Sequence, residues 1–374
     1  MRVVQLLGPS AGGIGTHVAQ LAAGLRRSGD QVVVVAPEAT FDAFPALDRG
    51  DGCAWWPLER SAGAMVRATR ELPHVRALVS GADVLHAHGH RAGLVGLGLV
   101  AGLRAAPRFV VSLHNAVLAG GGPGHDVAQR CVARRADLVT GASSDLVAGA
   151  RRHGARPVRL APVPSPRVPG LLATPVLDAA GRRVEAARLL RAAHLPDDGR
   201  PLVVTVSRTA QQKDLPVLVE AAAALRGACV WVVVGTGDPR LERQLREQVV
   251  RLGAPVHFIG HQGRVDDWLR AAEVFVLTSR WEARALVVQE AMAAGTPVVA
   301  TEVGGLPDLL AGPGSLVPVG DAAAVAVQVR QLLRDPALRR DRAALVRSAA
   351  RDLAGEDDTV AMWRGWYAEP SSMT

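Results

Sequence analysis

Two glutamates stand in a segment that otherwise has an apolar pattern. Glu282 and Glu290 lie at either end of an aliphatic run that continues into AMAAGTPVVAT. A strand-like run ends near Arg280 and Gly295 is a typical helix end, which predicts Glu282 in a loop and Glu290 in a short helix. The carboxylates would then be roughly one to two helical turns apart. They could hold the hydroxyl groups of two sugars, with a phosphate on the helix N-terminus between them.

Two cations share one loop earlier in the chain. Arg208 follows the apolar run at 202–206, and Lys213 comes just before a helix expected from Asp214. This pair suits a diphosphate, because a guanidinium forks onto two oxygens and an ammonium acts as a point charge. A solvated charged turn is the alternative interpretation. Lys213 is the single lysine in the chain, among 43 basic residues, and this favours phosphate binding.

A glycine-rich loop, GPSAGGIGTHV, follows the first strand-like run and opens a helix. Glycines there would let the backbone approach a ligand closely, and a tight structural turn is the other interpretation. Neither this loop nor GTGDPR completes the G-x-G-x-x-G pattern, because Val18 and Arg240 stand at the third glycine position. Dinucleotide binding is therefore disfavoured.

Several histidines follow strand-like runs. His86, His88 and His90 alternate, so on a strand they would face one side. Only Asp83 stands near enough in sequence to complete a ligand set, and we therefore expect no metal site there. Contact of His88 or His90 with a substrate and a purely structural role both stay open. His114 ends another strand-like run and is expected in the catalytic site.

Composition narrows the class of protein. A chain of 374 residues with 49% hydrophobic and 3% aromatic residues fits two globular α/β domains. No apolar run reaches the roughly 20 residues of a spanning helix, and a strand-like run from Val3 leaves no visible signal peptide. The three widely spaced cysteines fit reduced thiols, so we expect a cytoplasmic protein.

The net charge of +8 is unevenly distributed. Residues 1–165 contain 18 arginines and 11 acidic residues, a balance of +7. A basic N-terminal half could meet an anionic membrane surface or a phosphate-bearing acceptor. Nucleic acid is the weakest candidate, because no aromatic residues interleave the arginines. Solvated helix faces are the alternative explanation.

The elements that must position these residues alternate as in parallel βαβ units. The strand candidates are 3–7, 31–36, 84–88, 109–113, 138–141, 202–206, 229–234, 256–259, 274–277 and 297–300. The proline cluster PVPSPRVPG is typical of an interdomain linker. We therefore predict an α/β protein of two doubly wound, Rossmann-like domains facing a cleft, with ligands at the carboxyl ends of the strands. The predicted ranges are 1–165, a linker and connecting helix at 166–199, 200–352, and a helix at 353–374 that packs back towards the first domain.

The arrangement around Glu282 and Glu290 resembles the E-x7-E motif of the retaining GT-B glycosyltransferases of family four, the group 1 glycosyltransferases. EAMAAGTPVVAT and the G-G-x-P of 304–307 are similar to the same family. Further resemblances are GGIGTHV to its N-terminal glycine loop, DVLHAHGHRAG and VVSLHN to its acceptor-side strands, SRTAQQKDLPVLVEA to its R-x4-K loop, VVVGTGDP to its second glycine turn, and VHFIGHQG to its base-contacting loop.

The resemblance implies a hexosyltransferase that uses a nucleoside-diphosphate sugar, retains anomeric configuration and needs no metal or other cofactor. The domain 1–165 would bind the acceptor and 200–352 the nucleotide sugar. The implied catalytic residues are His114, Glu282, Arg208 and Lys213, the cations neutralising the diphosphate. The implied donor-binding residues are Gly13, Gly235, His261, Arg284, Leu286, Val287 and Glu290. The implied acceptor-binding residues are His17 and His88.

One departure from the family pattern concerns the donor. Ala283, Arg284 and Ala285 stand where the family usually has Gly-Phe-Gly, and each alanine adds a Cβ near the expected sugar. This indicates altered donor choice or lost activity, and Arg284 could bind an extra anionic group or simply be exposed. A GT-B sugar-nucleotide epimerase and a non-catalytic GT-B nucleotide-binding scaffold are the alternative functions. The acceptor is unknown; a phosphorylated or lipid-linked one, with peripheral contact to the inner membrane face, is one hypothesis.

Overall fold

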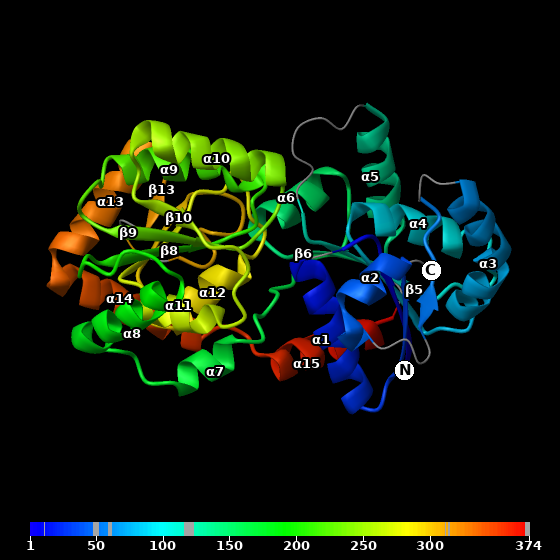
Figure 1. Ribbon diagram of the computed structural model, residues 1–374. Coiled ribbons are helices and arrows are strands. Elements are labelled where there is room, and N and C mark those ends of the chain that lie inside the picture. Colours follow the sequence, from blue (N-terminus) through cyan, green and yellow to red (C-terminus); the bar gives the residue numbers. More distant parts are fainter. Residues whose placement is uncertain are drawn as a thin grey trace. The chain divides into compact units, whose positions relative to one another are not determined.

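The computed structural model describes residues 1–10, 12–47, 52–58, 62–115, 123–310, 312 and 315–370 (Figure 1). The chain forms two compact units. Unit 1 comprises Met1–Pro164 with Ala354–Thr374, and unit 2 comprises Ser165–Leu353. Each unit is a parallel sheet covered by helices, and the expected fold class of two Rossmann-like α/β domains is confirmed.

The sheet of unit 1 has the strand order β3-β2-β1-β4-β5-β6-β7. The strands are β1 (Arg2–Leu7), β2 (Gln31–Ala36), β3 (Cys53–Ala54), β4 (Val84–His88), β5 (Arg108–Leu113), β6 (Leu138–Gly141) and β7 (Val158–Leu160). Because β1 pairs with β2 on one side and β4 on the other, the winding direction reverses there. Ligands of doubly wound sheets bind at the carboxyl ends of such strands.

The helices of unit 1 are α1 (Gly13–Arg27), α2 (Glu38–Ala43), η1 (Pro45–Leu47), α3 (Ala62–Ser80), α4 (His90–Val100), α5 (Pro123–Arg135), α6 (Ser144–Arg152) and α15 (Glu356–Ala368). The last of these, at the end of the chain, is an integral part of unit 1. Trp363 and Tyr367 of α15 are buried in its apolar core. Gly24 of α1 leaves room for this packing, because a Cβ there would lie 2.3 Å from a side-chain carbon of Val360.

The sheet of unit 2 has the order β10-β9-β8-β11-β12-β13, with its switch point between β8 and β11. The strands are β8 (Leu202–Val206), β9 (Val230–Val234), β10 (Val256–Phe258), β11 (Val274–Leu277), β12 (Val298–Thr301) and β13 (Leu316–Val317). The helices are α7 (Val168–Ala173), α8 (Ala179–Ala192), η2 (Gln211–Lys213), α9 (Leu215–Ala223), α10 (Pro239–Leu252), α11 (Val265–Ala271), α12 (Leu286–Ala293), α13 (Ala322–Arg334) and α14 (Pro336–Arg351).

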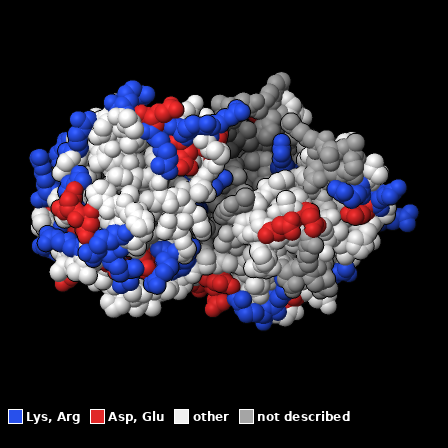
Figure 2. Space-filling view, in the orientation of Figure 1, with Lys and Arg blue, Asp and Glu red and all other residues white. Residues whose placement is uncertain are grey.

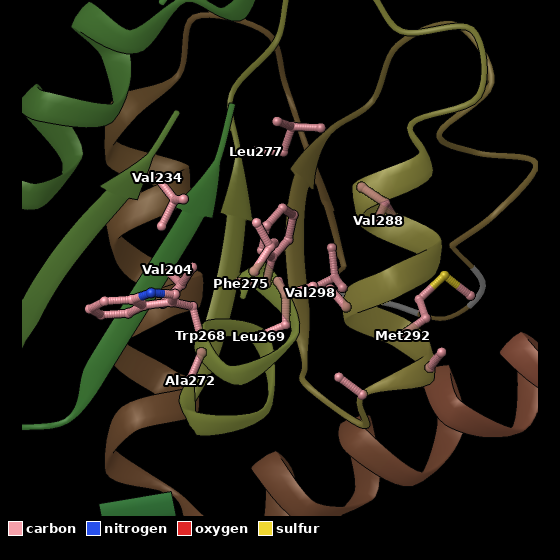
Figure 3. Packing of buried hydrophobic residues seen from close by; sticks show 14 of the residues in the cluster. Val204, Val234, Trp268, Leu269, Ala272, Phe275, Leu277, Val288, Met292 and Val298 are labelled. Atoms are coloured by element: carbon pink, nitrogen blue, oxygen red, sulfur yellow. The ribbon is translucent and has the colours of Figure 1, made fainter. Parts of the chain in front are cut away.

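A dense apolar cluster holds α12 against the sheet of unit 2. Val288 and Met292 of α12 lie beside Phe275 of β11 and Val298 of β12, and all four are nearly inaccessible to solvent (Figure 3). Burial of each such side chain contributes about 1.5–3 kcal/mol. The short helix is therefore positioned by packing, since eight residues would not form a stable helix alone.

The structure differs from the sequence prediction mainly at the sheet edges. Strands β3, β7 and β13 were not predicted, because two or three residues are too few to show a strand pattern. Residues 166–199, expected to be a linker and connecting helix, contain α7 and α8, whose apolar faces are buried in the core of unit 2.

Two further features concern the cysteines and the lengths of the apolar helices. Cys53, Cys131 and Cys229 are all free thiols. Among the described residues, no helix combines the length and the apolar character needed to span a bilayer.

Candidate functional site

The loops after β8 and β11 bring Lys213 and Glu282 into direct contact. The Lys213 Nζ lies 2.5 Å from Glu282 Oε1, and the Ser279 hydroxyl donates to the same oxygen at 2.6 Å. Both charged side chains are largely buried, with 14% and 9% of their surface exposed. An ammonium has three N–H donors, and no second acceptor for this one is found in the described parts of the chain. Two donors therefore stay available to a ligand.

Polar contacts join the two loops around this pair. Asp214 has a left-handed backbone conformation, with φ of 47°, and its carboxylate accepts from the Arg280 guanidinium at 3.0 Å. The Gln212 side chain donates to the main-chain oxygen of Trp281 at 2.6 Å. Gln212 and Asp214 are the neighbours of Lys213 in the sequence, so these two bonds hold the Lys213 ammonium beside the loop after β11.

Arg208 is exposed directly after β8, and no hydrogen-bond acceptor for its guanidinium is found among the described residues. The neighbouring turn after β9 requires glycine. Gly235 has φ of 133°, and a Cβ there would lie 2.2 Å from the main-chain oxygen of Ser207. Arg208 therefore lies at the carboxyl edge of the sheet, beside the turn after β9, and its contact with a phosphate stays a prediction.

Glu290 lies inside α12 and is held by two residues from before α7. The Ser165 hydroxyl donates to Glu290 Oε1 at 2.6 Å, and a guanidinium nitrogen of Arg167 lies 3.5 Å from Oε2. Burial raises the pKa of Glu290, while the contacts with Ser165 and Arg167 oppose that shift. Sequence reasoning missed both partners, because they are about 125 positions away and carry no motif of their own.

The N-terminus of α12 presents unpaired amides between the two glutamates. The amides of Val288 and Gln289 donate to the Ala285 oxygen, whereas those of Leu286 and Val287 have no acceptor among the described residues. The N-cap residue, Ala285, makes no side-chain hydrogen bond to this terminus. Two N–H groups and the positive end of the helix dipole are therefore available to an anion, as the sequence predicted.

The segment Ala283–Ala285 explains part of the departure from the family pattern. The Ala285 side chain is buried in the apolar cluster of unit 2, so its Cβ packs in the core. Arg284 is half-buried, and within the described ranges its Nε has no hydrogen-bond partner. Burial lowers the pKa of Arg284, and the charge of Asp308 opposes this. Of the two alternatives for Arg284, binding of an anionic group or simple exposure, the half-buried side chain disfavours simple exposure. His261, expected to contact the base, is exposed in the loop after β10.

A separate cavity of about 900 Å³ in unit 2 is lined by arginines of α8 and α14. Figure 2 shows basic side chains over the region of these helices. Glu273 and Pro297, which precede β11 and β12, also line this cavity. It therefore lies at the amino ends of these strands, away from the loops that carry Lys213 and Glu282. Arg182, its most buried arginine, donates to main-chain oxygens including that of Ala272 and so has a structural role.

In unit 1, three histidines gather at the carboxyl ends of β4 and β5 and on α1. His88 Nδ1 lies 3.1 Å from His114 Nε2, and the ring of His17 lies 5.4 Å from that of His114. Burial lowers the pKa of His17 to about 4 and that of His114 to about 3, so both rings are neutral at pH 7. The predicted residues His17, His88 and His114 therefore lie together. Gly13 is exposed at the start of α1.

A chain of buried hydrogen bonds supports this cluster. The His88 Nε2 lies 2.6 Å from Gln5 Oε1, and the Gln5 amide nitrogen donates to the Tyr367 hydroxyl at 3.3 Å. The same hydroxyl lies 2.6 Å from His86 Nδ1. Gln5 and Tyr367 were not predicted as functional. A lone glutamine inside the apolar run RVVQLL was the available signal.

His90 lies apart from His86 and His88, on the next element of the fold. It begins α4, and its ring contacts the main-chain oxygen of Asn115 at 3.0 Å. The strand alternation ends at His88, so the expectation that three alternating histidines face one side is wrong for His90. The ring of His88 contacts His17 of α1 and His114, which follows β5, besides its hydrogen bond with Gln5 of β1.

Comparison with known proteins places this geometry in a family. The family described as "Glycosyl transferases group 1" matches residues 200–335, and "Glycosyl transferase 4-like domain" matches residues 12–166. D-inositol 3-phosphate glycosyltransferase 1 of Catenulispora acidiphila is 34% identical over 365 residues, covering 88% of this chain and 84% of that protein. A D-inositol 3-phosphate glycosyltransferase of Xylanimonas cellulosilytica is 30% identical, with 94% and 90% covered.

Solved structures agree on the fold. Anabaena HepE in complex with UDP superposes with a TM-score of 0.82 at 19% identity, covering 98% of this chain and 99% of HepE. Sucrose-phosphate synthase from Thermosynechococcus elongatus gives a TM-score of 0.77 at 24% identity, with 98% of each chain covered. The chain belongs to the group 1 glycosyltransferases, retaining hexosyltransferases of the GT-B fold.

Proposed function

We propose that this enzyme transfers a hexose from a uridine-diphosphate sugar to a hydroxyl group of a phosphorylated polyol, without a metal cofactor. Binding of the donor is proposed from one observation, the Lys213–Glu282 pair in the loops near the N-terminus of α12. The pairing places a cation with spare donors, two free amides and a carboxylate on neighbouring loops of one unit. A departing diphosphate needs the positive charge and the N–H donors, and the sugar attached to it needs the carboxylate as a hydrogen-bond acceptor.

Each residue then has a definite task in the donor half. Arg208, Lys213 and the amides of Leu286 and Val287 stabilise the charge that develops on the departing diphosphate. Glu282 accepts hydrogen bonds from the hexose. Glu290 accepts them from the ribose through Oε2, because Ser165 already occupies Oε1. Gly235 and His261 shape the nucleotide side.

Uridine is proposed because HepE, which shares the fold, was solved with UDP and with UDP-glucose. The phosphorylated polyol is proposed because two relatives at 30% identity or more are named as D-inositol 3-phosphate glycosyltransferases. In unit 1, His17 and His88 are assigned to the acceptor and His114 to the reacting sugar. His88 ends β4, His114 follows β5, and His17 lies beside them on α1, so the cluster is at the carboxyl edge of the sheet, where ligands of such sheets bind.

The test measures thermal stabilisation by UDP, GDP, ADP and dTDP, each with one sugar-bearing form, followed by transfer assays with inositol phosphates. A ligand at about 100 times its Kd should add about 2.7 kcal/mol to the free energy of unfolding. Selective stabilisation by UDP and its sugar supports the donor assignment. If the nucleotides stabilise the protein but no transfer follows, a non-catalytic scaffold is favoured, and if none of them stabilises it, the donor assignment fails. Conversion of the donor sugar without any acceptor would favour an epimerase.

Metal independence has its own test. Transfer should continue unchanged after exhaustive EDTA treatment, because arginine, lysine and amides supply the positive charge. Complete loss of activity that Mg²⁺ or Mn²⁺ restores would overturn this part of the proposal.

Peripheral contact with an anionic membrane is a further proposal, resting on the balance of +7 in residues 1–165. Co-sedimentation with phosphatidylglycerol vesicles should fall steeply between low and physiological salt, because the Debye length shortens from ~30 Å at 0.01 M to ~8 Å at 0.15 M. Absence of binding at low salt would remove the proposal.

A further inference from the structure

We propose that His17, His88 and His114 form a binding site for a zinc-like transition-metal ion, and that occupation of this site inhibits sugar transfer. The inhibitory role rests on the proposed function, because it assumes that these residues serve the acceptor and the reacting sugar. The binding itself does not depend on that function. The ion is an inhibitor here, which agrees with a transfer reaction that needs no metal.

The ring nitrogens of the three histidines are spaced as metal ligands are. One ring nitrogen from each histidine lies within 4.8 Å of the others, and all three residues are buried. Two ligands of a tetrahedral zinc ion, each at about 2.0–2.1 Å, lie about 3.3 Å apart. The 3.1 Å between His88 Nδ1 and His114 Nε2 is close to that spacing. Rotation of the His17 ring would bring in the third ligand.

The tautomer of His88 also suits metal binding. The Gln5 amide nitrogen donates to Tyr367, so its oxygen faces His88 Nε2 and can only accept. His88 therefore carries its proton on Nε2 and directs the lone pair of Nδ1 towards His114. Metal-binding histidines almost always donate their second ring N–H to a group of this kind. Gln5 is fully buried and fixed by its own hydrogen bond, so this support is rigid.

The third feature is the environment of the His17 ring. The residue is only 2% exposed, and no hydrogen-bond partner for its ring is found in the described part of the chain. Buried polar groups are nearly always hydrogen-bonded, so an unpartnered buried imidazole beside two others indicates a missing ligand.

The donor set selects the kind of ion. Three imidazoles without a carboxylate or thiolate suit Zn²⁺, Co²⁺, Ni²⁺ or Cu²⁺, whereas Mg²⁺ and Ca²⁺ prefer oxygen ligands. Three protein ligands leave a fourth position for water. A bound ion would occupy the His114 nitrogen that faces His88 and prevent that ring from moving towards a substrate.

The experiment titrates the EDTA-treated full-length protein with Co²⁺ and records the visible absorption of tetrahedral cobalt. We expect bands that saturate at about one Co²⁺ per chain and that Zn²⁺ abolishes. His17→Phe keeps the ring volume but removes a ligand, and should lose the bands. Gln5→Leu, which removes the support of His88, should weaken binding about 10–100-fold.

His257→Phe is the matched control. His257 lies on β10 in unit 2, is half-buried and stands outside the cluster. This variant should retain the saturable cobalt bands. Circular dichroism of each apo variant checks that loss of binding does not come from unfolding.

Two results would overturn the site: wild-type protein with no saturable cobalt bands, or bands that persist unchanged in His17→Phe. For the inhibitory role, stoichiometric Zn²⁺ should block transfer by the wild type and EDTA should restore it. Transfer that is unaffected by one bound Zn²⁺ would refute inhibition. If no transfer is found with any donor, the cobalt titration still decides whether the metal site exists.

Discussion

Replacement of Lys213 is the sharpest test of the donor site, because this residue is the only lysine in the chain. In Lys213→Ala the diphosphate loses one charge-assisted hydrogen bond, which contributes about 1.5–3 kcal/mol. The change also leaves the Glu282 carboxylate with the Ser279 hydroxyl as its remaining polar contact in the described part of the chain, and close to the incoming phosphates. UDP affinity should therefore fall at least about 10- to 100-fold, at 1.4 kcal/mol for each factor of ten.

Calorimetric titration with UDP and UDP-glucose separates the two members of the pair. Lys213→Ala should weaken both ligands alike, because the diphosphate is common to them. Glu282→Gln should weaken UDP-glucose more than UDP, since the carboxylate is assigned to the hexose. Equal UDP affinity in Lys213→Ala and the wild type, within about twofold, would refute the reasoning; a donor with another base would be titrated in the same way.

The single lysine also permits a chemical test on unmodified protein. An amine-selective acylating reagent can react only with Lys213 and the N-terminal amine, and the latter is paired with Asp30 at 2.9 Å. Saturating UDP should protect Lys213 from modification and leave the reaction at Met1 unchanged. Equal labelling of Lys213 with and without a bound nucleotide would contradict direct phosphate contact.

Four further outcomes are expected. Burial raises the folded-state pKa of Glu290 above its unfolded value, so its ionisation destabilises the fold as pH rises through that pKa. Glu290→Gln should therefore be more stable than the wild type to denaturant at pH 7 but not below about pH 4, although its nucleotide binding is weakened. His114→Ala should reduce the transfer rate far more than UDP-sugar affinity, and equal losses would make it a binding residue instead. Gly235→Ala should destabilise unit 2 by about 1–3 kcal/mol or more, because its φ of 133° and the Ser207 oxygen leave no room for a Cβ. Trp363→Ala should cost unit 1 about 3–5 kcal/mol in chemical unfolding, and a loss below about 1 kcal/mol would show that α15 is not part of its core.

The sequence by itself determined the class of fold and the local motifs. Buried parallel strands are continuous apolar runs, so most central strands could be located to within about a residue of their observed ends. The glutamate pair, Arg208 and Lys213 were recognisable for a similar reason. Each depends on a strand, a turn and a helix that follow one another directly in the chain. Such consecutive elements can be recognised from the order of the residues alone.

Only the tertiary structure decided which distant residues complete each site. Ser165 holds Glu290 across 125 positions, and Tyr367 at the end of the chain orients Gln5 at its beginning. The strand pattern placed His86, His88 and His90 in one group, whereas the fold joined His88 to His17 and His114. Parallel sheets bring together residues that follow different strands, and the order of those strands is set by packing of the whole unit. A single sequence carries no local signal of that order, which is why these contacts could not be predicted.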